Sequence, residues 1–329
     1  MRKSLSLFFG FLAFGLSAFA MGSNSAVVTE RIRVSSGGDR TEISGQRLAT
    51  IRDDDIQRHA GDVDYFKHIQ IDERIVSENG FVWHLLRFKS TTKPVGPLWM
   101  VPHDDENAAF EGAIAALKQH GGVAVVVNSG PGSARRQAGK GTCGVRADVV
   151  TSCDPNRNFA ASSPKFTDSF LSQRPTGQPV IALHTNSPGF SGDGRGGNGE
   201  ITMLDVAAFK RGKIQPRSGG YFAMKPTADM TNYDTLALTA YLAKDEKLAV
   251  PAIACQNAMT KAGVHFWHER VGQSDGSMSN YLVIKHPDIA YLNAESRLET
   301  NLDVASKRYQ VMVAAYLKGC AKSWNQPVP

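Results

Sequence analysis

The sequence predicts a single α/β domain built around a central mixed, largely parallel sheet that is flanked by helices. Between residues 98 and 127, a short apolar run, an amphipathic stretch and a second apolar run follow one another, which is the pattern of a strand–helix–strand unit. The hydrophobic share of 42% is sufficient for a substantial core. We find no internal repeat and no low-complexity linker, which favours one domain over two.

The elements of this unit can be placed from their composition. Residues 81–88 combine aromatic and branched side chains, which favours a strand, and residues 98–101 predict a short buried strand. A helix is expected over residues 107–120, because apolar side chains recur there at helical spacing and two glycines follow. Residues 123–127 are all apolar and predict another buried strand.

The rest of the chain contains further elements of both kinds. Most are short apolar runs between polar or glycine-rich segments, and one long amphipathic stretch lies near the end. Strands are expected at residues 179–183, 250–255, 281–284 and 289–292, and helices at residues 234–244 and 300–318.

The first 20 residues are expected to lie outside the domain. Arg2 and Lys3 precede the apolar stretch 5–16, and residues 18–20 (Ala-Phe-Ala) fit a cleavage site, so the order is that of a secretory signal peptide. A retained membrane anchor is the alternative, but the apolar stretch is short for one. No later stretch is apolar enough to span a bilayer, so we expect a secreted or periplasmic protein without a membrane span.

Residues 21–60 are polar and mixed and are expected to form a leader, followed by the catalytic domain at 61–322 and a tail at 323–329. The formal net charge of +6 falls to +4 when the signal peptide is removed, because residues 1–20 contain two cations and no acid. This mild basic bias suits a protein near anionic cell-wall polymer. It is too weak to indicate a nucleic-acid partner.

Four cysteines follow the signal peptide: Cys143, Cys153, Cys255 and Cys320. An even number in an oxidising compartment suggests two disulfides, with three possible pairings. The short loop between the first two favours Cys143–Cys153, which leaves Cys255–Cys320. No C-x-x-C pair is present, so a zinc site built from thiolates is not expected.

A motif with metal-ligand spacing follows the strand at residues 98–101. His103 and Glu106 come directly after this strand, where α/β sheets present their ligands. Zinc accepts both imidazole nitrogen and carboxylate oxygen. The alternative is an acidic turn, in which Asp104, Asp105 and Glu106 favour the positive start of the next helix.

A catalytic zinc ion needs a third protein ligand and an open position for water. His184 directly follows the apolar run 179–183 and therefore lies at the end of another predicted strand. A buried histidine satisfied by hydrogen bonds is the alternative for His184 alone. Because His103 and Glu106 offer the other two ligands, we expect His184 to complete the site.

The segment 154–159, Asp-Pro-Asn-Arg-Asn-Phe, lies between these ligands. His-x-x-Glu, Asp-x-Asn-Arg-Asn-Phe and a strand-end Leu-His, in this order, resemble the zinc carboxypeptidases and their relatives, the aspartoacylase-like deacylases. The match covers four short segments of the chain. The resemblance implies a zinc-carboxypeptidase-like fold, zinc bound by His103, Glu106 and His184, and a substrate carboxylate held by Asn156 and Arg157.

The chemistry of the Asn-Arg pair agrees with this implication. The guanidinium of Arg157 offers a planar fork of donors that matches a carboxylate, and Asn156 adds a neutral donor. The alternative is an Asp-Pro-Asn turn that carries an exposed arginine.

The resemblance also implies an arginine that polarises the scissile carbonyl and a tyrosine that closes over the substrate. Arg135, Arg136 and Arg146 all precede the Asn-Arg pair, and the sequence does not choose among them, although we rank Arg136 first. Tyr281 is the candidate tyrosine, with a core tyrosine as the alternative.

The reaction further requires a general base, which the family places at the end of a late strand. Glu295 follows the apolar run 289–292 and is our first candidate. Glu269 is the rival, in a less strand-like context.

Together these features predict an exported zinc metallohydrolase that cleaves an amide or peptide bond next to a free carboxylate. Its substrate would be a peptide or an acyl amino acid, with peptidoglycan stem peptides as the first candidate. The second possible activity is deacylation of N-acyl amino acids, in which the enzyme cleaves an amide from the other side of the same carboxylate. A catalytically inactive cell-wall-binding protein is the third.

Overall fold

The computed structural model describes residues 28–35, 51–128 (except 52, 63, 79 and 80), 154–186, 220–223 and 234–322. The signal peptide predicted at residues 1–20 and the tail at 323–329 lie outside these ranges, and so do Arg136, Cys143 and Cys153.

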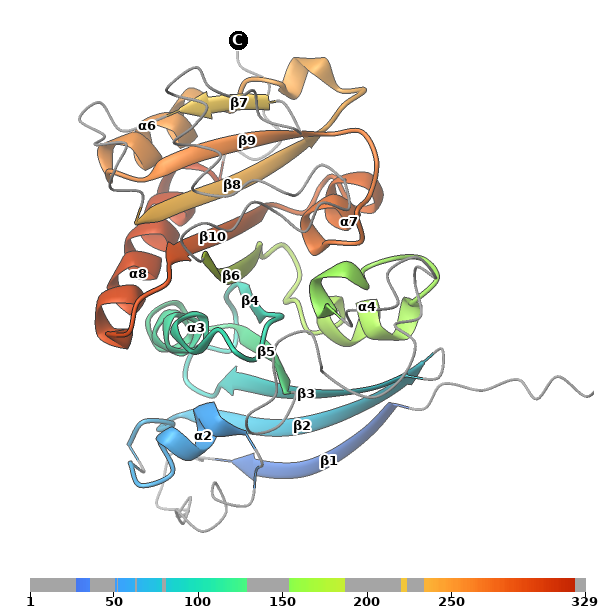
Figure 1. Ribbon diagram of the computed structural model, residues 1–329, viewed down its shortest axis with the longest axis vertical. Helices are drawn as coiled ribbons and strands as arrows, with labels where there is room; N and C mark the ends of the chain where they lie inside the picture. Colours follow the sequence, from blue (N-terminus) through green and yellow to red (C-terminus); the bar gives the residue numbers. More distant parts are fainter. Residues whose placement is uncertain are drawn as a thin grey trace, which may run out of the picture.

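One sheet of ten strands runs through the described part of the molecule (Figure 1). The strands are β1 (Val28–Ser35), β2 (Ile69–Glu78), β3 (Phe81–Ser90), β4 (Leu98–Val101), β5 (Val123–Asn128), β6 (Val180–Asn186), β7 (Gly220–Ala223), β8 (Thr235–Leu242), β9 (His265–Val271) and β10 (Tyr291–Arg297). Their order across the sheet is β1-β2-β3-β5-β4-β6-β10-β8-β9-β7.

The centre of the sheet is parallel and its flanks are mixed. Strands β5, β4, β6 and β10 run parallel to one another. The first three strands join this centre through antiparallel pairs, and β8 pairs antiparallel with β10 on the other side. β9 is parallel to β8, and β7 is antiparallel to β9. The predicted mixed α/β sheet is therefore confirmed, with parallel pairing concentrated at its centre.

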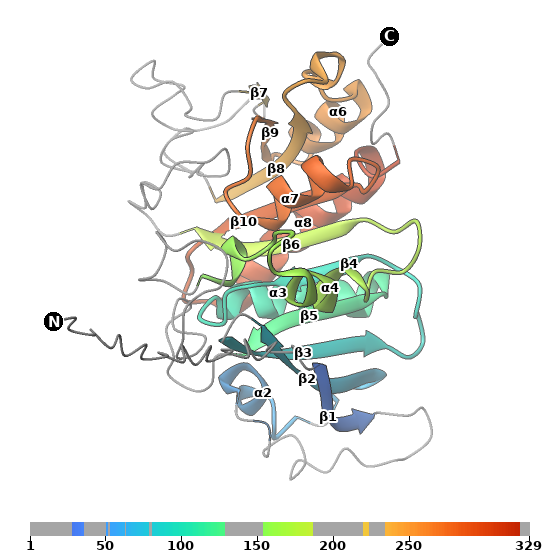
Figure 2. The ribbon, with the colours of Figure 1, turned by 90° about the vertical axis from the view of Figure 1, so that its right-hand side faces the viewer.

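Helices cover both faces of the sheet. The helices are α2 (Asp54–Arg58), α3 (Asn107–His120), α4 (Pro164–Leu171), α6 (Ile253–Lys261), α7 (Met278–Lys285) and α8 (Leu302–Gly319), with short 3-10 turns η2 (Pro155–Arg157) and η3 (Glu246–Leu248). α3, α6 and α8 pack on one face, and α4 and α7 pack on the other (Figures 1 and 2).

The segment expected to be a polar leader contributes to this architecture. β1 pairs with β2 along most of its length. Ile56 of α2 is fully buried in the same apolar cluster as Phe110 of α3 and Tyr309 of α8. The first part of the chain therefore extends the sheet and covers its end.

Helix α6 is joined to the end of α8 by a disulfide between Cys255 and Cys320, the predicted pairing. The two helices approach closely here, because a Cβ on Gly319 would lie 2.5 Å from the carbonyl oxygen of Ala254. A disulfide indicates an oxidising compartment. Within the described residues, no helix has the length and apolarity needed to cross a bilayer.

Three predicted elements are wrong. Residues 234–244, expected to be helical, contain strand β8. All of its inner residues are buried, so apolar side chains at helical spacing did not mark a single face. Residues 250–255, expected to be a strand, lead into helix α6, and residues 281–284 lie within helix α7.

Candidate metal centre

Three buried side chains converge at the carboxyl ends of β4 and β6. His103 Nδ1 lies 3.0 Å from Glu106 Oε1 and 3.2 Å from His184 Nδ1. His184 Nδ1 lies 3.5 Å from Glu106 Oε2. Each of the three residues is at most 6% exposed. These are the three metal ligands predicted from the sequence, and the fold brings them together as one potential metal-binding group.

The sheet explains why these residues meet. β4 and β6 are adjacent and parallel, so their carboxyl ends lie at the same edge. His103 follows β4 after a proline, Glu106 is the N-cap of α3, and His184 lies within β6. The turn between β4 and α3 therefore places His103 and Glu106 opposite the adjacent strand.

Hydrogen bonds from neighbouring residues hold each of the three potential metal ligands in place. Asp154 Oδ1 lies 2.8 Å from His103 Nε2, and Glu106 Oε2 accepts from the backbone N–H of Thr185 at 2.9 Å. The Tyr309 hydroxyl of α8 donates to the backbone carbonyl of His184 at 2.7 Å. These contacts fix the orientation of the side chains that would hold a metal.

The donor atoms fit a divalent cation such as zinc. Two ligands about 2.0–2.1 Å from a tetrahedral zinc ion lie about 3.3–3.4 Å apart, close to the three separations observed. Asp154 only accepts, so the neutral ring of His103 carries its hydrogen on Nε2 and presents a lone pair at Nδ1. That lone pair faces a carboxylate oxygen, and a positive charge between them would relieve their repulsion.

The electrostatics of the group also favour a cation. Burial alone would lower the pKa of His103, but Glu106 and Asp154 outweigh burial and raise this pKa to about 9. Burial would raise the pKa of Glu106, yet His103 and His184 hold it well below its usual range. In the absence of a metal, the group therefore retains a proton among its ligand atoms.

The Asn-Arg pair lies on η2, next to this group. Asp154 Oδ1, which contacts His103, also accepts from the backbone N–H of Asn156 at 2.9 Å. Asn156 Nδ2 lies 3.5 Å from His184 Nε2. Arg157 Nη1 donates to the backbone carbonyl of Asn156 at 2.9 Å. Asp154 therefore links the metal group to the predicted carboxylate-binding pair.

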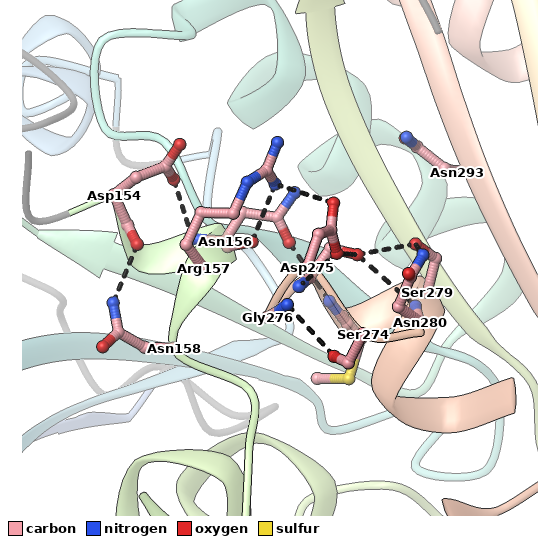
Figure 3. Close-up of polar contacts among 12 residues, drawn as sticks. Asp154, Asn156, Arg157, Asn158, Ser274, Asp275, Gly276, Ser279, Asn280 and Asn293 are labelled. Atoms are coloured by element: carbon pink, nitrogen blue, oxygen red, sulfur yellow. Dashed lines mark hydrogen bonds and ion pairs between the residues drawn. The ribbon is translucent and has the colours of Figure 1, made fainter. Parts of the chain in front are cut away.

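The loop before α7 supports this pair from below (Figure 3). Asn156 Oδ1 accepts from the backbone N–H of Met278, and the Gly276 carbonyl accepts from Phe159 N–H at 2.9 Å. Gly276 has a φ of +86°, and a Cβ there would lie 2.3 Å from the Arg157 carbonyl oxygen. Only glycine fits this contact and this conformation without strain.

Glu295 lies beside the metal group on β10. It pairs in register with His184 across the parallel strands β10 and β6, so both side chains lie on the same face. Asn293 Nδ2 donates to Glu295 Oε1 at 3.1 Å. Burial raises the pKa of Glu295, and the charge of Glu106 adds to this effect. A raised pKa makes this carboxylate a stronger base toward a proton from water.

The rival base, Glu269, occupies a different position. It lies within β9, is 2% exposed, and has Asp275 and Arg157 as its charged neighbours. Burial and the charge of Asp275 raise its pKa well above the usual range. Among the described residues, the charges that act on Glu295 include both histidines of the metal group, whereas those that act on Glu269 do not.

Tyr281 lies on α7, where its ring is tilted against that of His286 with centroids 5.7 Å apart, and it packs against the apolar cluster that includes α4. Within the described part of the chain, its recorded contacts do not include the metal group. Its role as a substrate-covering tyrosine stays a prediction. Arg136 lies outside the described residues.

Two residues that contact the predicted site residues were not assigned from the sequence. Asp154 opens the Asp-Pro-Asn-Arg motif, and its position there was the only available signal. Asp275 lies 3.9 Å from Arg157 Nη1, measured from its Oδ2, and is far away along the chain. No local pattern indicates such a contact.

No family model matches the chain, and no curated protein matches it. Several solved structures have a similar chain trace at low identity. A putative metallopeptidase from Shewanella amazonensis is 12% identical, with 83% of this chain and 93% of that chain covered at a TM-score of 0.38. A putative carboxypeptidase A from Shewanella denitrificans is 11% identical, with 75% and 63% covered at 0.39.

A succinylglutamate desuccinylase from Silicibacter sp. TM1040 is 12% identical, with 71% of this chain and 60% of that chain covered at a TM-score of 0.36. At these values the likeness assigns no activity to this chain. The chemistry of the site therefore rests on its own geometry.

Proposed function

We propose that this chain is an exported, zinc-dependent hydrolase of an amide or peptide bond that lies next to a free carboxylate on the substrate. The convergence of His103, Glu106 and His184 on one point carries the proposal. Glu295 beside this group and the Asn156–Arg157 pair next to it supply the other parts that such a reaction needs.

Each residue has a distinct task in this proposal. His103, Glu106 and His184 would hold zinc, which when bound lowers the pKa of water and polarises a carbonyl. Glu295 accepts the proton of the attacking water at its carboxylate and returns it to the leaving nitrogen. Arg157 and Asn156 bind the substrate carboxylate and orient the bond to be cleaved.

The proposed export of the protein suggests a class of substrate. The Cys255–Cys320 disulfide is compatible with export, and the mild positive charge suits an anionic cell wall. We therefore place peptidoglycan stem peptides first and N-acyl amino acids second. Release of a terminal amino acid from stem peptides, compared with release of an acyl group from acyl amino acids, separates these two activities.

Metal analysis tests the core of the proposal. Purified wild-type protein should contain about one zinc ion per chain, and H103A and H184A should lose it. H84A is a matched control, because His84 lies on β3 with its side chain 43% exposed and paired with Glu73. Wild-type protein that carries no metal and cannot be reloaded would refute the zinc site. Metal-loaded protein that is inert toward both substrate classes but binds peptidoglycan would favour a binding protein.

A further inference from the structure

One peptide group near the end of β6 contacts both the metal group and helix α8. This peptide group joins His184 to Thr185. Its N–H, which belongs to Thr185, donates to Glu106 Oε2 at 2.9 Å. Its carbonyl, which belongs to His184, accepts from the hydroxyl of Tyr309 at 2.7 Å. Two hydrogen bonds on one planar, rigid unit therefore connect Tyr309 to Glu106.

The direction of these hydrogen bonds is fixed by their chemistry. A carbonyl oxygen can only accept, so the Tyr309 hydroxyl is the donor to His184. The Thr185 hydroxyl, 3.3 Å from the Tyr309 hydroxyl, can then donate to the phenol oxygen. A donor to the carbonyl of an amide polarises that amide and makes its N–H a stronger donor. The Tyr309 hydroxyl therefore strengthens the hydrogen bond that holds Glu106.

The carboxylate held in this way belongs to the metal group. Glu106 Oε2 lies 3.5 Å from His184 Nδ1, and Glu106 Oε1 lies 3.0 Å from His103 Nδ1. His184 is itself part of the peptide group that Tyr309 contacts. One hydroxyl therefore restrains two of the three potential metal ligands, one through its backbone and the other through its side chain.

The ring of Tyr309 has little room to move. Tyr309 is fully buried in the apolar cluster that joins α3, α8 and the sheet. A Cβ on Gly112 of α3 would lie 2.5 Å from the ring atom Cδ2, and Gln310 Nε2 donates to the Gly112 carbonyl at 3.1 Å. Because Glu106 is the N-cap of α3, these contacts close a loop that runs from α3 through β6 and α8 and back to α3.

We propose that Tyr309 is a positioning residue that sets the metal affinity of this centre, because its hydroxyl holds Glu106 and His184 through one peptide group. This inference rests on the proposed function and adds to it a residue of α8 that is not itself a ligand. Residues that support metal ligands in this way typically change metal affinity by about 10- to 100-fold.

Y309F tests the proposal because it removes the hydroxyl and retains the ring. The packing of α8 on α3 should be preserved, whereas the dissociation constant for zinc should rise at least about tenfold. Competition with a chromophoric chelator measures this constant. Thermal unfolding of the metal-free proteins, measured alongside, reports any loss of stability separately. A zinc dissociation constant equal to that of wild-type protein would overturn the proposal.

Y316F is the matched control. Tyr316 lies on the same helix and in the same apolar cluster, and it is also fully buried. Within the described part of the chain, its hydroxyl makes no hydrogen bond. Y316F should therefore bind zinc as tightly as wild-type protein. An equal loss of zinc affinity in both variants would show that α8 acts only through packing and would refute the role of the Tyr309 hydroxyl.

A measurement on metal-free protein separates this inference from the proposed zinc site. When threonine is the only isotope-labelled amino acid, the amide proton of Thr185 reports its hydrogen bond to Glu106 by nuclear magnetic resonance, and T185S identifies the signal by removing it. The signal should move upfield in Y309F, as expected for a weaker hydrogen bond, and should not move in Y316F.

The two measurements fail in different ways. If wild-type protein binds no zinc, the proposed function fails, while an upfield shift in Y309F still shows that Tyr309 holds Glu106. An unchanged Thr185 signal in Y309F refutes the positioning role, even in protein that binds zinc and hydrolyses peptides.

Discussion

Glu295 combines a buried carboxyl group with a position one strand away from His184. Its neighbours, both histidines of the metal group and Glu106, make it sensitive to the charge at that group. A base in this position must be ionised to accept a proton, so its pKa sets the lower pH limit of activity.

E295Q should keep its metal and lose turnover by at least about 100-fold, because the amide cannot accept the proton. In wild-type protein, kcat/KM should rise with pH through a pKa above 4.5, the ordinary value for glutamate, because the folded protein raises this pKa. Metal content and a pH profile of kcat/KM measure both effects. E299Q, at a partly exposed glutamate paired with Arg308, is the control. Full turnover in E295Q would move the base to another residue, with Glu269 as the first candidate.

Single residues of the metal group were predictable because their signals are local. His103 and Glu106 follow one buried strand, and His184 lies near the end of another. Asp275 was not predictable, since its contact with Arg157 depends on how α7 packs against η2. The chemistry of single side chains can be predicted from the local sequence, whereas contacts between residues that meet only through packing cannot.

The loop between β9 and α7 acts as a support for η2. Its backbone accepts from Phe159, its helix start donates to Asn156, and Gly276 touches the Arg157 carbonyl. The position of the Arg157 guanidinium therefore depends on a contact that leaves no space for a side chain.

G276A should lower the free energy of unfolding by about 1–3 kcal/mol and raise KM for substrates with a free carboxylate, because the new Cβ displaces the Arg157 backbone. G177A is the matched control. Gly177 also has a positive φ, +73°, but a Cβ there meets no atom within 4 Å. G177A should show only the conformational cost, about 1 kcal/mol, with KM unchanged. Denaturant unfolding and steady-state kinetics measure the two effects, and equal KM values in both variants would contradict the support role.

Elements were predicted best where one face is buried. α3 and α8 were found within a few residues of their bounds, because each has an apolar stripe and an end signal. β8 was assigned to the wrong class because it is buried on both faces, between β10 and β9 in the sheet. Its environment, which determines its conformation, is created by strands that lie elsewhere in the sequence.

At the scale of the whole molecule, the Cys255–Cys320 disulfide joins two helices that cover the same face of the sheet. It closes a segment that contains most of α6 and all of β9, α7, β10 and α8. Glu295 and the loop that supports Arg157 therefore both lie inside the closed segment.

Replacing both cysteines with alanine should lower the free energy of unfolding by about 4 kcal/mol in the chain-entropy model, given the separation of 65 residues. Urea unfolding monitored by circular dichroism measures this change. Metal content at low denaturant should stay at the wild-type level, because the metal ligands lie outside the closed segment. Unchanged stability in the double variant would show that packing of α6 against α8 alone holds this face together.

The sheet reverses its direction between β10 and β8. Glu295 of β10 pairs with Leu236 near the start of β8, and Glu269 pairs with Ala240, four positions further on. At about 3.3 Å per residue, Glu269 lies roughly 13 Å along the strands from the level of Glu295. The reversal therefore separates the two candidate bases along the sheet. Glu295 stays at the level of His184, with which it pairs, whereas Glu269 is displaced from that level by about four residues of extended chain.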